Sequence, residues 1–325
     1  MQSKRGDPGA KPDRAGRVAP EPRRGAREAA SGADADREGL AAGLYLVSTP
    51  IGNAADISLR ALKVLECADA IAAEDTRQTR KLMEIHGIAL RGRPMTPYHD
   101  RNGPKARPRI AAWLEEGCAV AYCTDAGSPL IADPGYRLAQ LAIENGHPVT
   151  TVPGASAVLA ALPLSGLPTD RFFFGGFLPT RSGERGRALH EVAGLRATLV
   201  YYESPRRLAA TLADMALALG ASRPAAVARE LTKLHEEVRR GTLGELAAAF
   251  AEGPAPRGEI VILVGAAGDD AAGADAKDLD AALRAALSEL SVKDAAREVA
   301  AALGLPRREV YARALELSKA RDEER

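Results

Sequence analysis

The stretch CAVAYCTDAGSPLIADPGYRLAQLAIENG, residues 118–146, is the part of the sequence that decides the expected fold. It begins as an apolar run and continues as a turn, TDAGSPLIADPG (residues 124–135), with two Gly, two Pro and two Asp in twelve residues. It ends as a helical pattern that stops at Gly146. A buried strand, a turn and an amphipathic helix form the repeating unit of parallel α/β sheets. Ligands bind at the carboxyl ends of such strands, so the turn is a candidate binding site.

The same alternation extends on both sides of this stretch and predicts an N-terminal α/β domain over residues 43–166, with a mostly parallel sheet. The expected strands are residues 44–49, 69–75, 118–123 and 148–153. The expected helices are residues 57–68, 76–87, 105–117, 136–146 and 155–166.

A second α/β domain is expected over residues 170–265. Its strands are predicted at residues 197–204, 225–231 and 258–265, and its helices at residues 205–220 and 243–252. Residues 1–40 have the composition of a disordered tail, and residues 266–278 that of a flexible linker. Residues 279–325 predict two helices around the turn LGLPR, which fits either a helix-turn-helix extension or a plain helical hairpin.

Composition excludes several classes of protein. The 325 residues are 46% hydrophobic and carry a net charge of only +1, so no overall field draws the chain to nucleic acid. Cys67, Cys118 and Cys123 are an odd number without CxxC spacing, which argues against disulfides and a metal site and fits a reducing cytoplasm. No apolar run is long enough to span a membrane, and neither GxxxxGK[ST] nor a GxGxxG after the first strand is present.

Seven motifs in series resemble one family, the ribosomal RNA small-subunit methyltransferase I family of the tetrapyrrole-methylase superfamily. They are LYLVSTPIGNAADISLRAL (44–62), AAEDTRQTRKLM (72–83), TDAGSPLIADPGYRL (124–138), VPGASAVLAAL (152–162), GGFLP (175–179), YYESPRRL (201–208) and ARELTKLHEE (228–237). The resemblance covers residues 43–265, and the C-terminal hairpin is similar to an extension often found in this family. Residues 1–40 resemble nothing in it.

The resemblance implies two α/β domains of tetrapyrrole-methylase type, with S-adenosyl-L-methionine in a cleft between them, and a homodimer. It implies 2′-O-methylation of the ribose of a cytidine in the decoding region of 16S rRNA, with the free rRNA or the 30S subunit as substrate. Carried over by position, the cofactor contacts are Pro50, Ile51, Asp125, Gly127, Ser128, Pro129, Ile131, Ser156, Ala157, Tyr202 and Ala228, with Gly258 as a further candidate. Ser128 stands where many relatives have Thr, and it keeps the hydroxyl.

Methyl transfer to a ribose hydroxyl requires alignment and a positioned base. Three groups of residues offer one. The first is His99 with Asn102 three residues on; the second is Glu74 and Asp75, with Arg77 as a phosphate clamp; the third is Glu230 and Lys233, the lysine acting through a lowered pKa. Asp75 and His99 rank slightly ahead, and the base stays open. The residues expected on RNA phosphates are Arg77, Arg80, Lys81, Arg101, Arg206 and Arg207.

Two other functions remain compatible with the sequence. One is a methyltransferase of the same superfamily that acts on a tetrapyrrole or another small molecule. The other is a non-catalytic protein that senses S-adenosyl-L-methionine through a helix-turn-helix. The motifs YHDRN (98–102) and AEDTR (73–77) and the C-terminal hairpin resemble the RNA branch and argue against the first.

Overall fold

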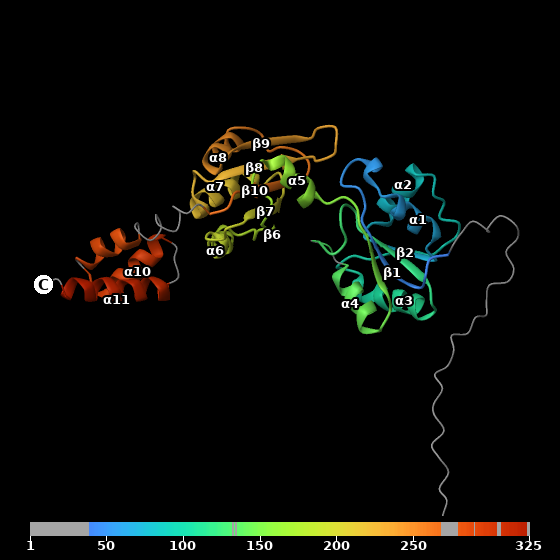
Figure 1. Cartoon of the computed structure of the whole chain (residues 1–325), viewed down its shortest axis with the longest axis horizontal. Helices are drawn as coiled ribbons and strands as arrows, with labels where there is room; N and C mark the ends of the chain where they lie inside the picture. Colours follow the sequence, from blue (N-terminus) through green and yellow to red (C-terminus); the bar gives the residue numbers. More distant parts are fainter. Residues whose placement is uncertain are drawn as a thin grey trace, which may run out of the picture. The chain divides into compact units, whose positions relative to one another are not determined.

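The structure is a computed structural model that describes residues 39–131, 133, 135–267, 279–288, 290–303 and 307–323 (Figure 1). Residues 1–38 of the expected tail, 268–278 of the expected linker and 304–306 of the expected hairpin turn lie outside the described residues.

The first sheet has the strand order β3-β2-β4-β1-β5, and each of its pairings is parallel. Its strands are β1 Gly43–Val47, β2 Ala70–Ala73, β3 Met95–Pro97, β4 Ala119–Cys123 and β5 Val149–Val152. Strands β2 and β4 are buried throughout, which explains why they appear in the sequence as continuous apolar runs. The expected parallel sheet is confirmed, with β3 as an additional short strand.

Helices cover both faces of this sheet (Figure 1). On one face α1 Leu59–Cys67 and α2 Thr76–Ile85 pack on a core that includes Val47, Ile71 and Cys123. On the other face α3 Gly103–Glu115 and α4 Tyr136–Glu144 pack on Leu44, Val120 and other residues of the same strands. The turns that join strands to helices therefore gather at one edge of the sheet.

The second sheet has the order β6-β7-β10-β8-β9. Its strands are β6 Phe172–Phe177, β7 Thr198–Glu203, β8 Pro224–Arg229, β9 Glu237–Thr242 and β10 Ile260–Val264. Only β6 and β7 pair in parallel; β7 with β10, β10 with β8 and β8 with β9 are antiparallel. The second domain is thus α/β as expected, but its sheet is mixed and is wider than the sequence analysis indicated.

Helices α6 Ser182–Val192, α7 Leu208–Leu219 and α8 Leu243–Ala251 cover one face of the second sheet. Helix α5 Ala157–Ser165 lies on the other face, where Val158, Ala161 and Leu162 join the core formed by β7, β8 and β10. Ile51 from the first domain packs in that same core, so the β1–α1 loop is fixed against the second domain.

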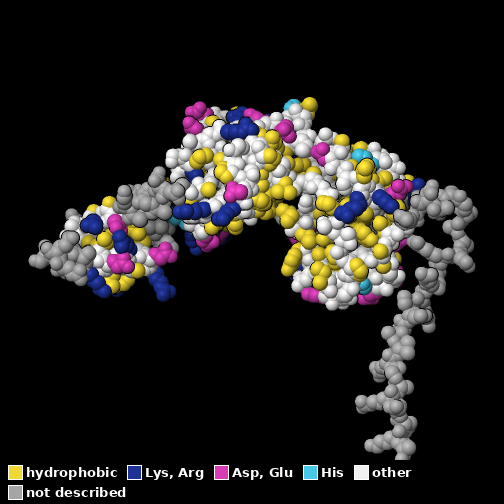
Figure 2. Space-filling model, in the orientation of Figure 1, with side chains coloured by type: hydrophobic (Ala, Val, Ile, Leu, Met, Phe, Trp, Pro, Cys, Tyr) yellow, Lys and Arg dark blue, Asp and Glu magenta, His cyan; other side chains and the backbone are white. Residues whose placement is uncertain are grey.

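The C-terminal residues form their own small core. A helix over residues 279–287, α10 Val292–Leu303 and α11 Arg307–Glu323 bury a cluster that includes Leu283, Val299 and Val310. Positive and negative side chains mix on the face of these helices seen in Figure 2. Within the part of the chain that the structure describes, no helix combines the length and hydropathy needed to cross a membrane.

Candidate functional site

Two strand-end loops of the first domain are joined directly. The backbone of Thr49 donates to Gly127 O at 2.9 Å and accepts from Gly127 N at 3.1 Å. The Thr49 hydroxyl donates to Thr124 O. Gly127 has a φ of 82°, which side-chain-bearing residues rarely adopt. The loops after β1 and β4 therefore form one rigid edge.

A single carboxylate shapes the rest of the turn at residues 124–135. Asp133 Oδ1 accepts from the backbone N–H of Leu130 at 3.1 Å and of Gly135 at 2.8 Å. The hydroxyl of Tyr122 donates to the same carboxylate, and burial raises the pKa of Tyr122, so the phenol stays protonated. This network holds Leu130 at a φ of 70°, unusual for a non-glycine residue.

A cavity of about 370 Å³ opens between this edge and the second sheet. On the face shown in Figure 2, hydrophobic side chains gather where the two α/β domains meet. Both domains contribute to the lining, which we call the apolar cavity; it consists of Ile51, Ala126, Gly127, Ser128, Ile131, Ser156, Ala157, Phe177, Tyr202, Glu203, Ser204, Pro205, Leu231, Gly258, Glu259, Ile260 and Val261.

Aromatic and aliphatic side chains stand open to solvent in the apolar cavity. Phe177 is 57% exposed and Ile131 is 45% exposed. The ring of Phe177 lies 5.6 Å from that of Tyr202, centroid to centroid, at an angle of 61°. When a flat apolar ligand binds in such a concavity it buries these exposed side chains, and this burial favours binding.

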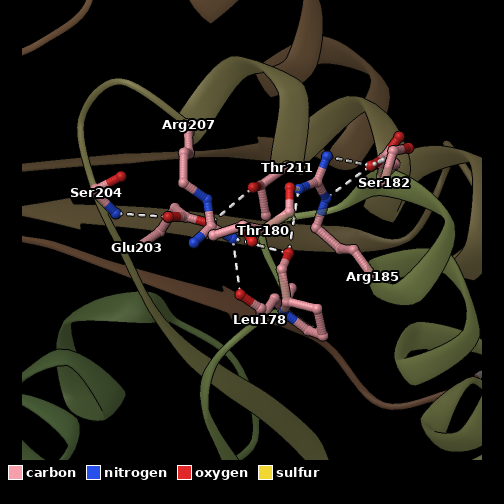
Figure 3. Close-up of polar contacts among 10 residues, drawn as sticks. Leu178, Thr180, Ser182, Arg185, Glu203, Ser204, Arg207 and Thr211 are labelled. Atoms are coloured by element: carbon pink, nitrogen blue, oxygen red, sulfur yellow. Dashed lines mark hydrogen bonds and ion pairs between the residues drawn. The ribbon is translucent and has the colours of Figure 1, made fainter.

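A buried ionic network fixes the wall that carries Tyr202 and Ser204 (Figure 3). The carboxylate of Glu203, at the end of β7, accepts from Ser204 N at 2.6 Å and from Thr211 Oγ1 at 2.7 Å. Arg207 Nη2 lies 3.2 Å from Glu203 Oε2 and also donates to Leu178 O at 2.8 Å. The loop after β6 is therefore tied to the end of β7.

Arg185 reinforces the same loop from helix α6. It donates through Nε to Asp214 Oδ2 at 2.7 Å and through Nη1 to Pro179 O and Thr180 O. Ser182 Oγ donates to the same Asp214 oxygen. Figure 3 shows Arg185 and Arg207 both reaching the loop around Leu178 and Thr180. Two cations thus fasten one loop that carries part of the cavity wall.

A second, more polar cavity of about 380 Å³ adjoins the first. We call it the polar cavity. Its lining comes from the β1–α1 loop, one side of α2, the turn after β4 and the second domain: Thr49, Pro50, Ile51, Gly52, Ala54, Gln78, Thr79, Lys81, Leu82, Ile85, Thr124, Asp125, Ala126, Lys233 and Glu259.

The loop between β8 and β9, residues 230–236, connects the two domains beside this cavity, and we call it the clasp. The hydroxyl of Thr232 accepts from Asn53 N at 3.1 Å. Glu230 and Thr232 have φ values of 51° and 64°, and a β-branched residue at positive φ is a genuine outlier. Strain of this kind persists only where the surroundings enforce it, and it is concentrated at functional sites.

The clasp places Lys233 as a cation and not as a base. Lys233 Nζ donates to Glu230 Oε1 at 2.8 Å and to Glu259 Oε2 at 3.1 Å. Burial lowers the pKa of Lys233, but these two carboxylates outweigh burial and the net pKa is raised. Glu230 in turn has a lowered pKa, chiefly because of Lys233. The expectation of a lysine with a lowered pKa is therefore wrong.

The two acids that end β2 have different surroundings. Asp75 caps α2 by accepting from Arg77 N and pairs with the Arg77 guanidinium through both oxygens. The Arg77 side chain is the main reason that the pKa of Asp75 is lowered from 3.8 to about 2. Burial raises the pKa of Glu74, whose Oε2 accepts from Thr124 Oγ1 and Asp125 N. Glu74 thus supports the turn after β4.

His99 and Asn102 lie at a different place. His99 lines a third cavity with Tyr98, Asp100 and residues of α3 and α4. Asn102 accepts from the backbone N of His99 at 2.8 Å and donates to Pro97 O at 2.8 Å. Asn102 therefore holds the backbone of the loop, and its contact is not with the imidazole ring.

The residues that the resemblance assigns to the cofactor divide between the cavities. Those that line the apolar cavity are Ile51, Gly127, Ser128, Ile131, Ser156, Ala157, Tyr202 and Gly258. Pro50 and Asp125 line the polar cavity. Pro129 and Ala228 are buried and line neither. Nine further residues of the lining were not predicted from the sequence, among them Phe177, Glu203, Ser204 and Glu259, although GGFLP and YYESPRRL contain the first three of these four.

The expected RNA-binding side chains also divide. Arg80, Lys81, Arg101 and Arg206 are exposed. Arg77 is exposed but already paired with Asp75. Arg207 is largely used within the network of Figure 3.

Family comparisons agree with this architecture. A family model for Tetrapyrrole (Corrin/Porphyrin) Methylases matches residues 43–247, and one for the RsmI C-terminal HTH domain matches residues 273–318. Two relatives are named ribosomal RNA small subunit methyltransferase I. The one from Mesorhizobium japonicum is 48% identical over 274 residues, covering 84% of this chain and 92% of its own. The one from Erythrobacter litoralis is 48% identical over 284 residues, covering 87% and 98%.

Two solved structures share the fold. A conserved hypothetical protein from Aeropyrum pernix K1 matches with a TM-score of 0.55 at 21% identity, covering 86% of this chain and 98% of its own. A cobalt precorrin-4 methyltransferase of cobalamin biosynthesis matches with a TM-score of 0.53 at 19% identity, covering 68% and 94%. The expected tetrapyrrole-methylase fold is thereby confirmed. With relatives at 48% identity aligned over nearly their full length, the chain belongs to the ribosomal RNA small subunit methyltransferase I family of tetrapyrrole methylases.

Proposed function

We propose that this protein transfers a methyl group from S-adenosyl-L-methionine to the ribose 2′-hydroxyl of a cytidine in the decoding region of 16S rRNA. The observation that carries the proposal is the apolar cavity, because eight of the residues that the resemblance assigns to the cofactor, from Ile51 to Gly258, line it together. Family membership supports the reaction class, and the resemblance of YHDRN and AEDTR to the RNA branch supports the acceptor.

The residues present fit an adenosine-bearing donor. Tyr202 and Phe177 offer aromatic faces, and Ile51 and Leu231 offer aliphatic surface for a purine. Ser128 and Ser156 add hydroxyls from loops of the first domain. Gly127 has a positive φ, and a Cβ added to it would lie 3.4 Å from Ile51 Cγ2. Because glycine has no side chain, the backbone there can come close to a ligand.

The protein's part in the chemistry is alignment. A sulfonium donor brings an already activated methyl group, and positioning alone can lower the barrier by about 7–11 kcal/mol. The joined loops at Thr49 and Gly127 fix the floor of the site, and the Glu203–Arg207 network fixes its wall. A ligand bound in the apolar cavity would cover exposed apolar side chains of both domains and displace water from them.

A direct test is transfer of a labelled methyl group by the purified protein, with 30S subunits and uroporphyrinogen offered separately. Label in 16S rRNA, mapped by mass spectrometry to a cytidine ribose, supports the proposal. Label in uroporphyrinogen alone supports a small-molecule methyltransferase. Calorimetry that detects no uptake of S-adenosyl-L-methionine, with or without 30S subunits, contradicts both enzymes.

We further propose that the protein works in the cytoplasm as a homodimer. The cysteines are free, which suits a reducing compartment. The homodimer follows from the family resemblance. Light scattering on the purified chain measures its mass in solution, and a mass of one chain contradicts the dimer.

A further inference from the structure

The polar cavity lies directly beside the apolar cavity. Ile51, Ala126 and Glu259 line both. Ligands in the two cavities would therefore lie against the same three residues. The two cavities also differ in chemistry, since the apolar one suits an aromatic ring and the polar one offers amide, hydroxyl and charged groups.

Cations from both domains face the polar cavity. Lys81 comes from α2 and is exposed, with no ion-pair partner among the described residues. Lys233 comes from the clasp of the second domain. Lys81 is suited to a phosphate beside a single nucleotide, because lysine binds phosphate as a point charge. Lys233 gives two of its three N–H donors to Glu230 and Glu259, and the third can reach a second phosphate.

The backbone of the clasp is strained in a way that places Lys233. Glu230 and Thr232, which both have positive φ, come just before Lys233 in the chain, and the Glu230 and Glu259 carboxylates hold its ammonium. Gly52 leaves room for this side chain: a Cβ there would lie 2.4 Å from Lys233 Cγ. Backbone strain at Glu230 and Thr232 and the absence of a side chain at Gly52 together allow Lys233 to reach the polar cavity.

The polar cavity is lined by two carboxylates, Asp125 and Glu259. Glu259 belongs to the shared wall and accepts from Lys233, whereas Asp125 stands next to Ala126 of that wall and has no lysine partner among the described residues. Its Oδ1 accepts from Asp75 N at 2.8 Å, and among the described residues no group donates to Oδ2. Partial burial of the carboxyl raises the pKa of Asp125, although the hydrogen bond from Asp75 N opposes this. A raised pKa makes a carboxylate a better proton acceptor near neutral pH.

We propose that the polar cavity holds the acceptor nucleotide of an RNA strand, with Lys81 and Lys233 on its phosphates and Asp125 Oδ2 taking the proton of its ribose hydroxyl. The hydroxyl oxygen forms a bond to the methyl carbon as the carbon–sulfur bond breaks, the electron pair stays on sulfur, and the hydroxyl proton passes to Asp125. This inference rests on the proposed function, and it moves Asp125 from the cofactor to the acceptor.

A cavity of about 380 Å³ admits one nucleotide and not a helix. The acceptor must therefore be unstacked, as in other enzymes that act on single nucleotides. The alternative occupant is the charged amino-acid end of the donor, which would also pair with Lys233 and Asp125. The two occupants make opposite predictions for donor affinity.

The experiment measures two quantities for each variant of the full chain: the Kd for S-adenosyl-L-methionine by calorimetry, and kcat and KM for methyl transfer to 30S subunits at several salt concentrations. The variants are Lys81→Gln, Lys233→Gln and Asp125→Asn. Lys63→Gln is the matched control, because Lys63 is an exposed lysine on α1 that lines none of the three cavities described above.

We expect all variants to keep the wild-type donor Kd. Each lysine variant raises KM for 30S subunits and lowers the slope of log KM against log salt by about one. Asp125→Asn leaves KM unchanged and lowers kcat by about 10²–10⁴-fold. Lys81 is exposed and makes no ion pair among the described residues, so Lys81→Gln is expected to fold normally. This variant therefore tests the inference even if another variant is unstable.

Two results overturn the inference. One is a weakened donor Kd in Lys233→Gln or Asp125→Asn, which places the donor's charged end in the polar cavity. The other is that all three variants have the same donor Kd, kcat, KM and salt dependence as Lys63→Gln. Either result leaves the proposed function standing as long as the wild-type chain methylates 16S rRNA, whereas a wild-type chain that binds no donor overturns the proposed function itself.

Discussion

The carboxylate of Asp75 has both oxygens engaged by Arg77 before any substrate is present. At the scale of the single residue, this distinguishes it from Asp125, which has an oxygen without a donor among the described residues and lines the polar cavity. The motif AEDTR does not show that Asp75 is engaged in this way, because the capping of α2 and the pairing with Arg77 depend on side-chain positions that the sequence does not give. A carboxylate whose pKa is about 2 is a weak base at neutral pH.

Asp75→Asn tests this description through the pH dependence of stability. The folded-state pKa of Asp75 is depressed from 3.8 to about 2, so its pairing stabilises the fold above pH 3.8 and is lost as the pH falls toward 2. Asn remains a good N-cap, so the variant removes the charge and keeps the cap. Thermal melts should show a wild-type advantage at neutral pH that shrinks below pH 3.8. An advantage that grows in acid contradicts the assignment.

Glu203→Gln tests the network behind the apolar cavity. Glu203 is only 3% exposed and accepts from Thr211, Ser204 and Arg207, so loss of its charge weakens charge-assisted hydrogen bonds. We expect the free energy of unfolding to fall by about 1.5–3 kcal/mol, measured by urea denaturation. Glu184→Gln, in the exposed pair with Arg181, is the matched control and should change stability by less than about 0.5 kcal/mol. Equal effects for the two variants would contradict the role of burial.

At the scale of elements, the position of the clasp depends on Gly52, which has no side chain to collide with it. A Cβ at Gly52 would lie 2.8 Å from Thr232 Oγ1 and 2.9 Å from Leu231 O, so Gly52→Ala must displace the clasp. We expect a loss of about 1–3 kcal/mol in stability, together with reduced methyl transfer. Gly183→Ala in α6, where an added Cβ meets nothing within 4 Å, should stabilise by about 0.5–1 kcal/mol. Denaturation and transfer assays on both variants check this pair, and unchanged activity in Gly52→Ala contradicts it.

How much of each element the sequence predicted depends on its burial. Strands β2, β4 and β10 are buried throughout and appear as apolar runs that mark them as strands. Strand β9 was not predicted, because EVRRGT is an edge strand with exposed Arg239 and Arg240. Helix α6 was not predicted either, since SGERGRALHEV contains two glycines and buries only Arg185 and Leu189. The motif loops predicted residues of the apolar cavity. The polar cavity was not predicted as a separate site, because part of its lining is Lys233 of the clasp, which β8 and β9 position.

At the scale of the whole molecule, the C-terminal helices have a core of their own. The cluster around Leu283, Val299 and Val310 contains no residue of either sheet, and Arg313 pairs with Asp280 inside the same segment. We expect a chain ending at residue 267 to keep the melting temperature of the two α/β domains within a few degrees. Calorimetry of the full and shortened chains checks this. A large drop would show that the helices support the sheets.

The clasp has a consequence for how the enzyme meets its substrate. Because Asn53 and Thr232 join the two halves, and Ile51 lies in the core of the second, the mouth of the site cannot widen by hinge motion without breaking packed contacts. Induced fit is then largely left to the RNA. A ribosomal strand that already bulges a nucleotide outward would enter readily, while a stacked one would be excluded, so the conformation of the substrate serves as the filter.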